Sequence, residues 1–263
     1  MLKKSLVTIV TILILISCAT SPLGRKQLML MPDEQLNTMG TEAFQSLKKE
    51  TKIEGSQKVN QYVTCIADAI IRVSNSPVKQ WEVAVFGDDS ANAFALPGGK
   101  MGVHTGLLKI AENQHQLAAV IGHEIAHVLA NHSNERFSQE LAVQQGLTLI
   151  QELGDVKTPA GQMMMGLLGV GAQVGIILPY SRIHESEADE MGLYLMAKAG
   201  FDPRESINLW HNMDKSGDAQ PPEFLSTHPS HDTRMARLNQ AMNSAMSLYQ
   251  QAQAEGRAPR CEL

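Results

Sequence analysis

The chain has 263 residues, of which 43% are hydrophobic and 19% are charged, and its formal net charge is -5. This length allows one sizeable globular domain, whereas two domains would each be small. The charge is mild and spread along the chain, so a basic nucleic-acid-binding surface is excluded and no nucleic-acid partner is expected.

The N-terminus predicts a signal peptide over residues 1–17. Lys3 and Lys4 precede the apolar run 6–16, which is too short to span a bilayer comfortably. The run ends in Leu-Ile-Ser-Cys, which resembles a bacterial lipobox, where cleavage precedes a cysteine that carries lipid. We therefore expect acylation of Cys18, and the alternative is an ordinary signal peptide with an incidental cysteine.

Acylation of Cys18 would anchor the chain to a membrane through residues 18–32, which are expected to form a lipidated tether. Ala19 stands where an inner-membrane retention aspartate would otherwise follow the cysteine. By resemblance to lipoprotein sorting rules, this residue predicts that the anchored chain is located at the periplasmic face of the outer membrane in a Gram-negative-type envelope. Cys65 and Cys261 then remain as a pair in an oxidising compartment, either bridged or both free.

Hydrophobic periodicity and turn residues predict a mainly helical chain with a few short strands, an α+β fold. Helices are expected over residues 33–50, 57–74, 105–111, 114–131, 134–152, 181–200, 203–215 and 232–252, and strands over 81–86, 91–96 and 100–104. The run 163–178 is apolar but short and contains Gln173, so it is expected to pack in the domain or form a flap rather than cross a membrane. We expect one domain over residues 33–253 and a flexible tail over 254–263.

The helix over 114–131 carries a metal-binding motif, His-Glu-Ile-Ala-His. His123 and His127 are one helical turn apart, so they share a face and can bind one Zn²⁺. Glu124 follows the first ligand directly and can act as general base on a zinc-bound water. Because the surrounding residues are apolar, the helix is buried, and buried charged groups need partners. A chance match on an amphipathic helix is therefore disfavoured.

A catalytic zinc usually takes three protein ligands and keeps one position open. The metzincin spacing is excluded, because Ser133 stands where that class has its third histidine. Glu185 and Asp189 are four residues apart on a predicted helix and share a face. We expect Glu185 to be the third ligand and Asp189 to accept the ring N–H of a ligand histidine, which orients that ligand.

These motifs together resemble the HtpX and CAAX-prenyl-protease family of zinc metallopeptidases, which are gluzincins. The resemblance rests on the two histidines, on the pattern from Ser181 to Gly192, on Asn92–Gly99 and on Thr227–Arg234. The lipoprotein signal indicates the soluble periplasmic branch, similar to BepA-like proteases. The resemblance implies a gluzincin domain with a small β-sheet whose edge strand faces the active-site cleft.

The resemblance also implies roles for two residues of the late motif. Arg234 would lie in the cleft and stabilise the oxyanion of the tetrahedral intermediate. His228 would either assist catalysis or occupy the fourth zinc position in a resting state. A loop histidine that caps the following helix is the alternative for His228.

The strand over 100–104 is expected to bind substrate, because proteases commonly hold a peptide as an added strand. Gly99 and Gly102 leave room for close approach, and His104 ends the strand. Together these features predict a zinc metalloendopeptidase of the bacterial envelope that hydrolyses misfolded or stalled proteins, with unfolded envelope proteins as substrates. The alternative is a non-proteolytic, chaperone-like assembly factor in which His228 plugs the zinc.

Overall fold

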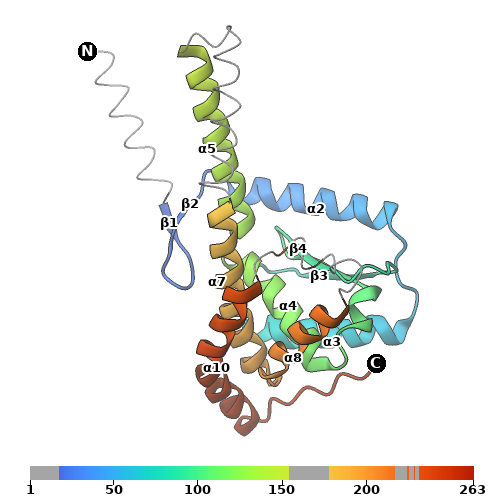
Figure 1. Ribbon diagram of the computed structural model, residues 1–263. Helices are drawn as coiled ribbons and strands as arrows, with labels where there is room; N and C mark the ends of the chain where they lie inside the picture. The colour runs from blue at the N-terminus through green and yellow to red at the C-terminus, as the bar shows by residue number, and fades with distance from the viewer. Residues whose placement is uncertain (1–17, 154–177, 217–223, 225–227, 229–230) are drawn as a thin grey trace. The chain divides into compact units, whose positions relative to one another are not determined.

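A computed structural model of the chain (Figure 1) describes residues 18–153, 178–216, 224, 228 and 231–263. The expected signal peptide and most of the apolar run 163–178 lie outside the described residues. The described residues are predominantly helical with two small sheets, which confirms the expected α+β class. No described helix combines the length and the apolar character needed to cross a membrane.

The chain divides into two compact units rather than the single domain expected over residues 33–253. One unit comprises residues up to Gln35 together with Asn131–Ile183, and the other comprises Leu36–Ala130 and His184–Leu263. The division cuts through two helices, α2 (Asp33–Glu50) and α7 (Leu178–Ala199). Each helix runs unbroken through its cut, so the local sequence gives no signal of a boundary there.

The first unit pairs a hairpin with a long helix. Strands β1 (Cys18–Thr20) and β2 (Lys26–Leu28) are antiparallel, and β2 packs on α5 (His132–Leu153). Arg25 donates two hydrogen bonds, of 2.6 and 2.7 Å, to the buried carboxylate of Glu135, and Gln27 donates a third of 2.9 Å. Residues 18–32 therefore include an ordered hairpin, which corrects the expected tether.

The second unit contains a three-stranded sheet of β3 (Glu82–Phe86), β4 (Ala93–Leu96) and β5 (Lys100–His104) in the order β3-β5-β4. Strand β5 is central, parallel to β3 and antiparallel to β4. A substrate strand cannot be added to a strand that is paired on both sides. The expectation that Gly99, Gly102 and His104 hold substrate along β5 is therefore wrong.

Packing explains these three residues instead, of which Gly99 directly precedes β5. A Cβ at Gly102 would collide with the rings of Phe94 and Phe86, so the glycine makes room for aromatic packing on this face of the sheet. Gly99 has a φ of 71°, in the region that favours glycine, and a Cβ there would lie 2.6 Å from Val78. The Nδ1 atom of His104 lies 2.7 Å from Ser90 Oγ.

Helices cover both faces of this sheet (Figure 1). On one face the ring of Phe44, from α2, meets Phe86 and Phe94 at centroid distances of 6.1 and 6.4 Å. The other face is covered by α3 (Gln57–Val73) and α4 (Gln114–Leu129), and it contributes Val85, Met101 and others to the main apolar core. The described part of the unit also contains the short helix η1 (Thr105–Lys109), most of α7, α8 (Glu205–Ser216) and α10 (His231–Ala254).

The C-terminal segment is fixed to the second unit, which corrects the expected flexible tail over 254–263. Cys261 forms a disulfide with Cys65 of α3, across 196 residues of sequence. Gln114, the first residue of α4, accepts a hydrogen bond from the Cys261 N–H at 2.8 Å and donates one to the Pro259 carbonyl at 3.0 Å. The C-terminal segment therefore lies against the start of the helix that carries the two motif histidines.

Candidate metal centre

Helix α4 presents the motif on a buried and well-capped helix. Asn113 caps its N-terminus and accepts hydrogen bonds from the N–H groups of His115 and Gln116 at 2.9 and 3.0 Å. Further along, His123 and Glu124 are only 4% and 3% exposed. The local sequence thus forms a rigid helix on which the motif histidines are one turn apart.

Helix α7 approaches α4 so closely that only glycines fit at the crossing. A Cβ on Gly192 would lie 2.7 Å from the backbone N of His123, and one on Gly122 would lie 2.8 Å from the Gly192 carbonyl oxygen. Real Cβ atoms essentially never approach backbone so closely. The two glycines therefore set the helix separation that lets the acids of α7 reach the histidines of α4.

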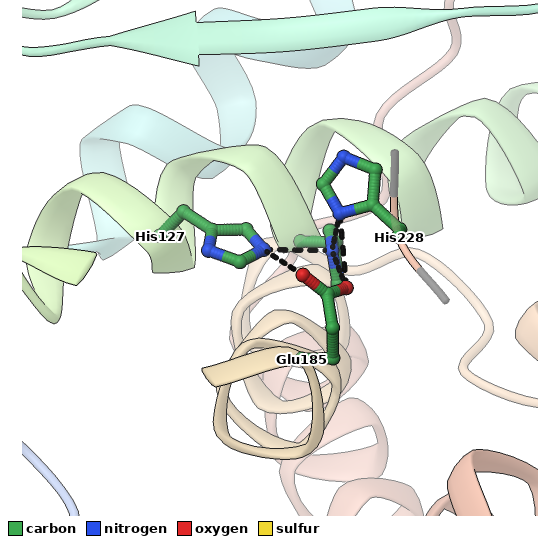
Figure 2. Close-up of side chains that lie close together, drawn as sticks. His127, Glu185 and His228 are labelled. Carbon is green, nitrogen blue, oxygen red and sulfur yellow. Dashed lines mark hydrogen bonds and ion pairs between the residues drawn. The ribbon is translucent and has the colours of Figure 1, made fainter. Parts of the chain in front are cut away.

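Three elements bring four potential metal ligands together. His127 comes from α4, Glu185 from α7 and His228 from the stretch before α10, and their side chains point toward one another (Figure 2). With His123 they form a cluster whose donor atoms all lie within 4.8 Å of one another. The motif histidines, Glu185 and His228 are therefore all brought to one site.

The distances between these donor atoms suit one zinc ion. The two Nε2 atoms of His123 and His127 are 3.0 Å apart, and Glu185 oxygens lie 3.3 and 3.5 Å from them. Nδ1 of His228 lies 3.2 Å from His123 Nε2 and 2.9 Å from Glu185 Oε2. Ligands about 2.0–2.1 Å from a tetrahedral zinc are separated by about 3.3 Å. The donor set therefore fits the metal.

Glu124 lies beside the cluster without belonging to it. Its Oε2 accepts a hydrogen bond of 3.0 Å from the Ala95 N–H of β4. Its Oε1 is buried, lies 3.5 Å from His228 Nε2 and accepts no hydrogen bond from the described residues. A buried carboxylate oxygen in this state is costly unless a further donor, such as a water at the metal position, satisfies it.

The electrostatics of the cluster favour a charged network. Burial acts to lower the pKa of His123, but hydrogen bonds to Asp189 and Glu185 outweigh it and raise the value to about 9. Burial acts to raise the pKa of Glu185, yet the hydrogen bonds from His123 and His228 hold it well below the usual range. Burial raises the pKa of Glu124. Metal binding must therefore displace a proton from His123.

Asp189 and Arg234 lie behind the cluster. Asp189 Oδ1 is 3.0 Å from His123 Nδ1, and Arg234 donates to both Asp189 oxygens at 2.6 and 2.7 Å. Arg234 Nη1 also donates to the His228 carbonyl at 2.8 Å. The expected position of Arg234 in the cleft is wrong, because its side chain is fully buried and its donors are directed to these groups.

Two aromatic residues at the site were not identified from the sequence. The ring of Phe224 stacks on His228 with centroids 4.5 Å apart, and the Arg234 guanidinium lies 4.3 Å from the ring centroid of Trp210. Isolated aromatic residues give no motif, and helical spacing alone places Trp210 in the core. Only the fold brings them to the site.

A family model for peptidase family M48 matches residues 57–242. The chain belongs to peptidase family M48. This family uses zinc, and the M48 assignment confirms the expectations of a metalloendopeptidase and of a zinc cofactor. It also confirms the broader gluzincin resemblance.

The curated relatives that this chain matches include proteases of two names. A mitochondrial metalloendopeptidase OMA1 from Schizosaccharomyces pombe is 38% identical over 70% of this chain and 53% of its own length. The human mitochondrial OMA1 is 29% identical over 86% of this chain and 46% of its own length. A beta-barrel assembly-enhancing protease from Yersinia pestis is 28% identical over 80% of this chain and 44% of its own length. The chain thus spans about half the length of these relatives.

These relatives correct two expectations. The most identical of these three is an OMA1 protease, not a protease of the HtpX or CAAX-prenyl type. OMA1 relatives are mitochondrial by name, which contradicts the expected location on the periplasmic face of an outer membrane. The location was inferred from a few residues at the N-terminus, outside the matched residues 57–242.

Proposed function

We propose that this M48 chain is a zinc-dependent endopeptidase that cleaves extended segments of misfolded or stalled proteins. His123, His127 and Glu185 would hold the zinc, and Glu124 would be the general base. One observation carries the proposal. The buried, hydrogen-bond-deficient Oε1 of Glu124 lies beside a cluster of donor atoms spaced for one zinc ion.

The chain's own residues have distinct roles in this proposal. Bound zinc would polarise the scissile carbonyl and lower the pKa of a nearby water. Glu124 Oε1 accepts the proton of the attacking water and is placed to deliver it to the leaving amine. The Ala95 N–H holds Oε2 and so fixes the direction in which Oε1 points. Asp189 holds His123 by its other ring nitrogen.

Substrate recognition is proposed for β4 rather than β5. Strand β4 pairs with β5 on one side and has no strand on its other side among the described residues. Its Ala95 N–H points from that outer edge to Glu124. A peptide added to this edge would pass the general base, and pairing through backbone groups selects extended chains rather than a particular sequence.

The test combines metal content with cleavage. The purified chain should hold one zinc and cleave unfolded casein, and a chelator should abolish cleavage. Glu124→Gln should keep the zinc and lose several orders of magnitude in turnover, because the base is gone while the ligands remain. Glu190→Gln is a matched control on α7, away from the cluster, and should cleave casein normally. Unchanged cleavage by Glu124→Gln would refute the role of the base.

A non-proteolytic assembly factor is the second candidate, and the position of His228 favours it. With Nδ1 2.9 Å from Glu185 and 3.2 Å from His123, this imidazole completes a four-ligand set and leaves no open position. For an enzyme, the same geometry describes a resting state. His228→Ala separates the candidates: casein cleavage should rise if His228 blocks the site and fall if it assists catalysis. A chain that cleaves nothing in either form would be a binding protein.

We also propose that Cys18 is acylated, which rests on the lipobox-like residues before it. The intact mass of the chain isolated from its native cells tests this. The expected mass begins at Cys18 and includes acyl groups, whereas a chain that retains residues 1–17 or lacks lipid would contradict it.

A further inference from the structure

Phe224 links His228 to the body of the second unit through its backbone. Its N–H donates to the Ala91 carbonyl at 3.0 Å, and its own carbonyl accepts the His228 N–H at 2.9 Å. The Phe224 side chain is only 2% exposed. The residue is therefore anchored to the chain just before β4 and is hydrogen-bonded to the backbone of the histidine.

The ring of Phe224 is stacked on the imidazole of His228. The centroids are 4.5 Å apart and the planes differ by 23°. The Phe224 ring also meets the His123 ring edge to face, with ring centroids 5.7 Å apart and an angle of 65° between the planes. Phe224 thus contacts two of the four donor residues, while its own ring has no metal-binding atom.

The surroundings of Phe224 leave its ring little room to withdraw. Trp210 lies 6.4 Å from it, and the Arg234 guanidinium covers Trp210. The cavity that these three side chains line with His123 and Asp189 has a volume of about 20 Å³, close to the room needed by one water. Among the described residues, Trp210 and His228 thus restrict the plane of the Phe224 ring from two directions.

We infer that Phe224 is a positioning residue that fixes the His228 imidazole with Nδ1 toward the metal position. This inference rests on the proposed role of His228 as a fourth zinc donor. The hydrogen bond from Arg234 Nη1 holds the backbone carbonyl of His228, and Glu185 Oε2 lies 2.9 Å from the ring nitrogen Nδ1. Stacking on Phe224 adds a constraint on the plane of the ring, and a stacked aromatic pair corresponds to about a 3- to 10-fold change in an equilibrium constant.

The experiment is a double-mutant cycle on zinc affinity, measured by chelator competition. Phe224→Leu should weaken zinc binding about 3- to 10-fold. In the His228→Ala background, the same substitution should change the affinity little, because the ring it orients is gone. The absorption spectrum of the cobalt-substituted Phe224→Leu protein should shift toward that of His228→Ala. Phe201→Leu removes an equally buried ring that packs on His115 instead, and it should leave zinc affinity unchanged.

The outcomes separate this inference from the proposed function. If His228→Ala weakens zinc binding and Phe224→Leu does not, the inference is overturned and the ligand set stands. Equal effects of Phe224→Leu in both backgrounds would mean a general packing role and would also overturn it. If His228→Ala leaves zinc affinity unchanged, the fourth-donor role fails and the inference fails with it. Should Phe224→Leu not fold, Phe224→Met removes the ring with less loss of volume and is measured in the same cycle.

Discussion

Oδ1 of Asp189 lies 3.0 Å from Nδ1 of His123, the ring nitrogen opposite the one that faces the donor cluster. Burial acts to raise the pKa of Asp189, but the Arg234 charge lowers it overall, so the group is a carboxylate that accepts the ring N–H. In the neutral imidazole that binds a metal, this contact selects the tautomer in which Nε2 carries the free lone pair. Helix α7 therefore sets the chemical state of a residue on α4.

We expect Asp189→Asn to weaken zinc binding about 10- to 100-fold, because a neutral amide orients and polarises His123 less well than a carboxylate. Chelator competition measures the change. Glu190→Gln, one residue along the same helix, is the control and should bind zinc as the unaltered chain does. Equal zinc affinity in Asp189→Asn would show that the contact is not needed for the metal.

Arg234→Ala should reduce the stability of the whole unit. The substitution leaves the buried charge of Asp189 without its cation, and breaking a buried pair in this way costs about 3–5 kcal/mol of the free energy of unfolding. Arg234→Lys should recover only part of it, because an ammonium group cannot donate along both carboxylate oxygens as the guanidinium does. Denaturant unfolding of the zinc-free proteins provides the measurement. Equal stability of Arg234→Ala and the unaltered chain would show that the buried ion pair does not hold the unit together.

Gly192→Ala should separate α7 from α4. The added Cβ would lie 2.7 Å from the His123 backbone N, and neither helix backbone can give way locally. We expect a loss of about 1–3 kcal/mol in the free energy of unfolding, together with weaker zinc binding. Gly146→Ala in α5 is the matched control, since a Cβ there meets nothing within 4 Å. That change should be neutral or stabilise by up to about 1 kcal/mol.

Local rules were sufficient for the helices and for most of the cluster. Helix α4 begins at Gln114 as expected, and the structure shows that Asn113 caps it there. The one-turn spacing of Glu185 and Asp189 also predicted that both face the same side. These properties depend on residues within one or two turns of helix.

Properties that depend on distant pairing were predicted poorly. The order β3-β5-β4 places Lys100–His104 in the centre of the sheet, and the parallel pairing of β3 with β5 is not encoded in either strand alone. The burial of Arg234 likewise depends on Trp210 and Asp189 from other helices. The spacing of residues within Thr227–Arg234 does not distinguish a buried arginine from one in a cleft.

The disulfide between Cys65 and Cys261 is expected to stabilise the metal-bearing unit. It closes a segment of 196 residues and holds the C-terminal segment where Gln114 at the start of α4 bonds to it. Removing a native disulfide typically costs about 2–5 kcal/mol of the free energy of unfolding, chiefly because the unfolded chain gains conformational freedom.

The double variant Cys65→Ser with Cys261→Ser should lower the denaturant midpoint by a corresponding amount. A reductant should lower it for the unaltered chain and not for the double variant. An equal midpoint with and without reductant in the unaltered chain would show that the bridge does not contribute.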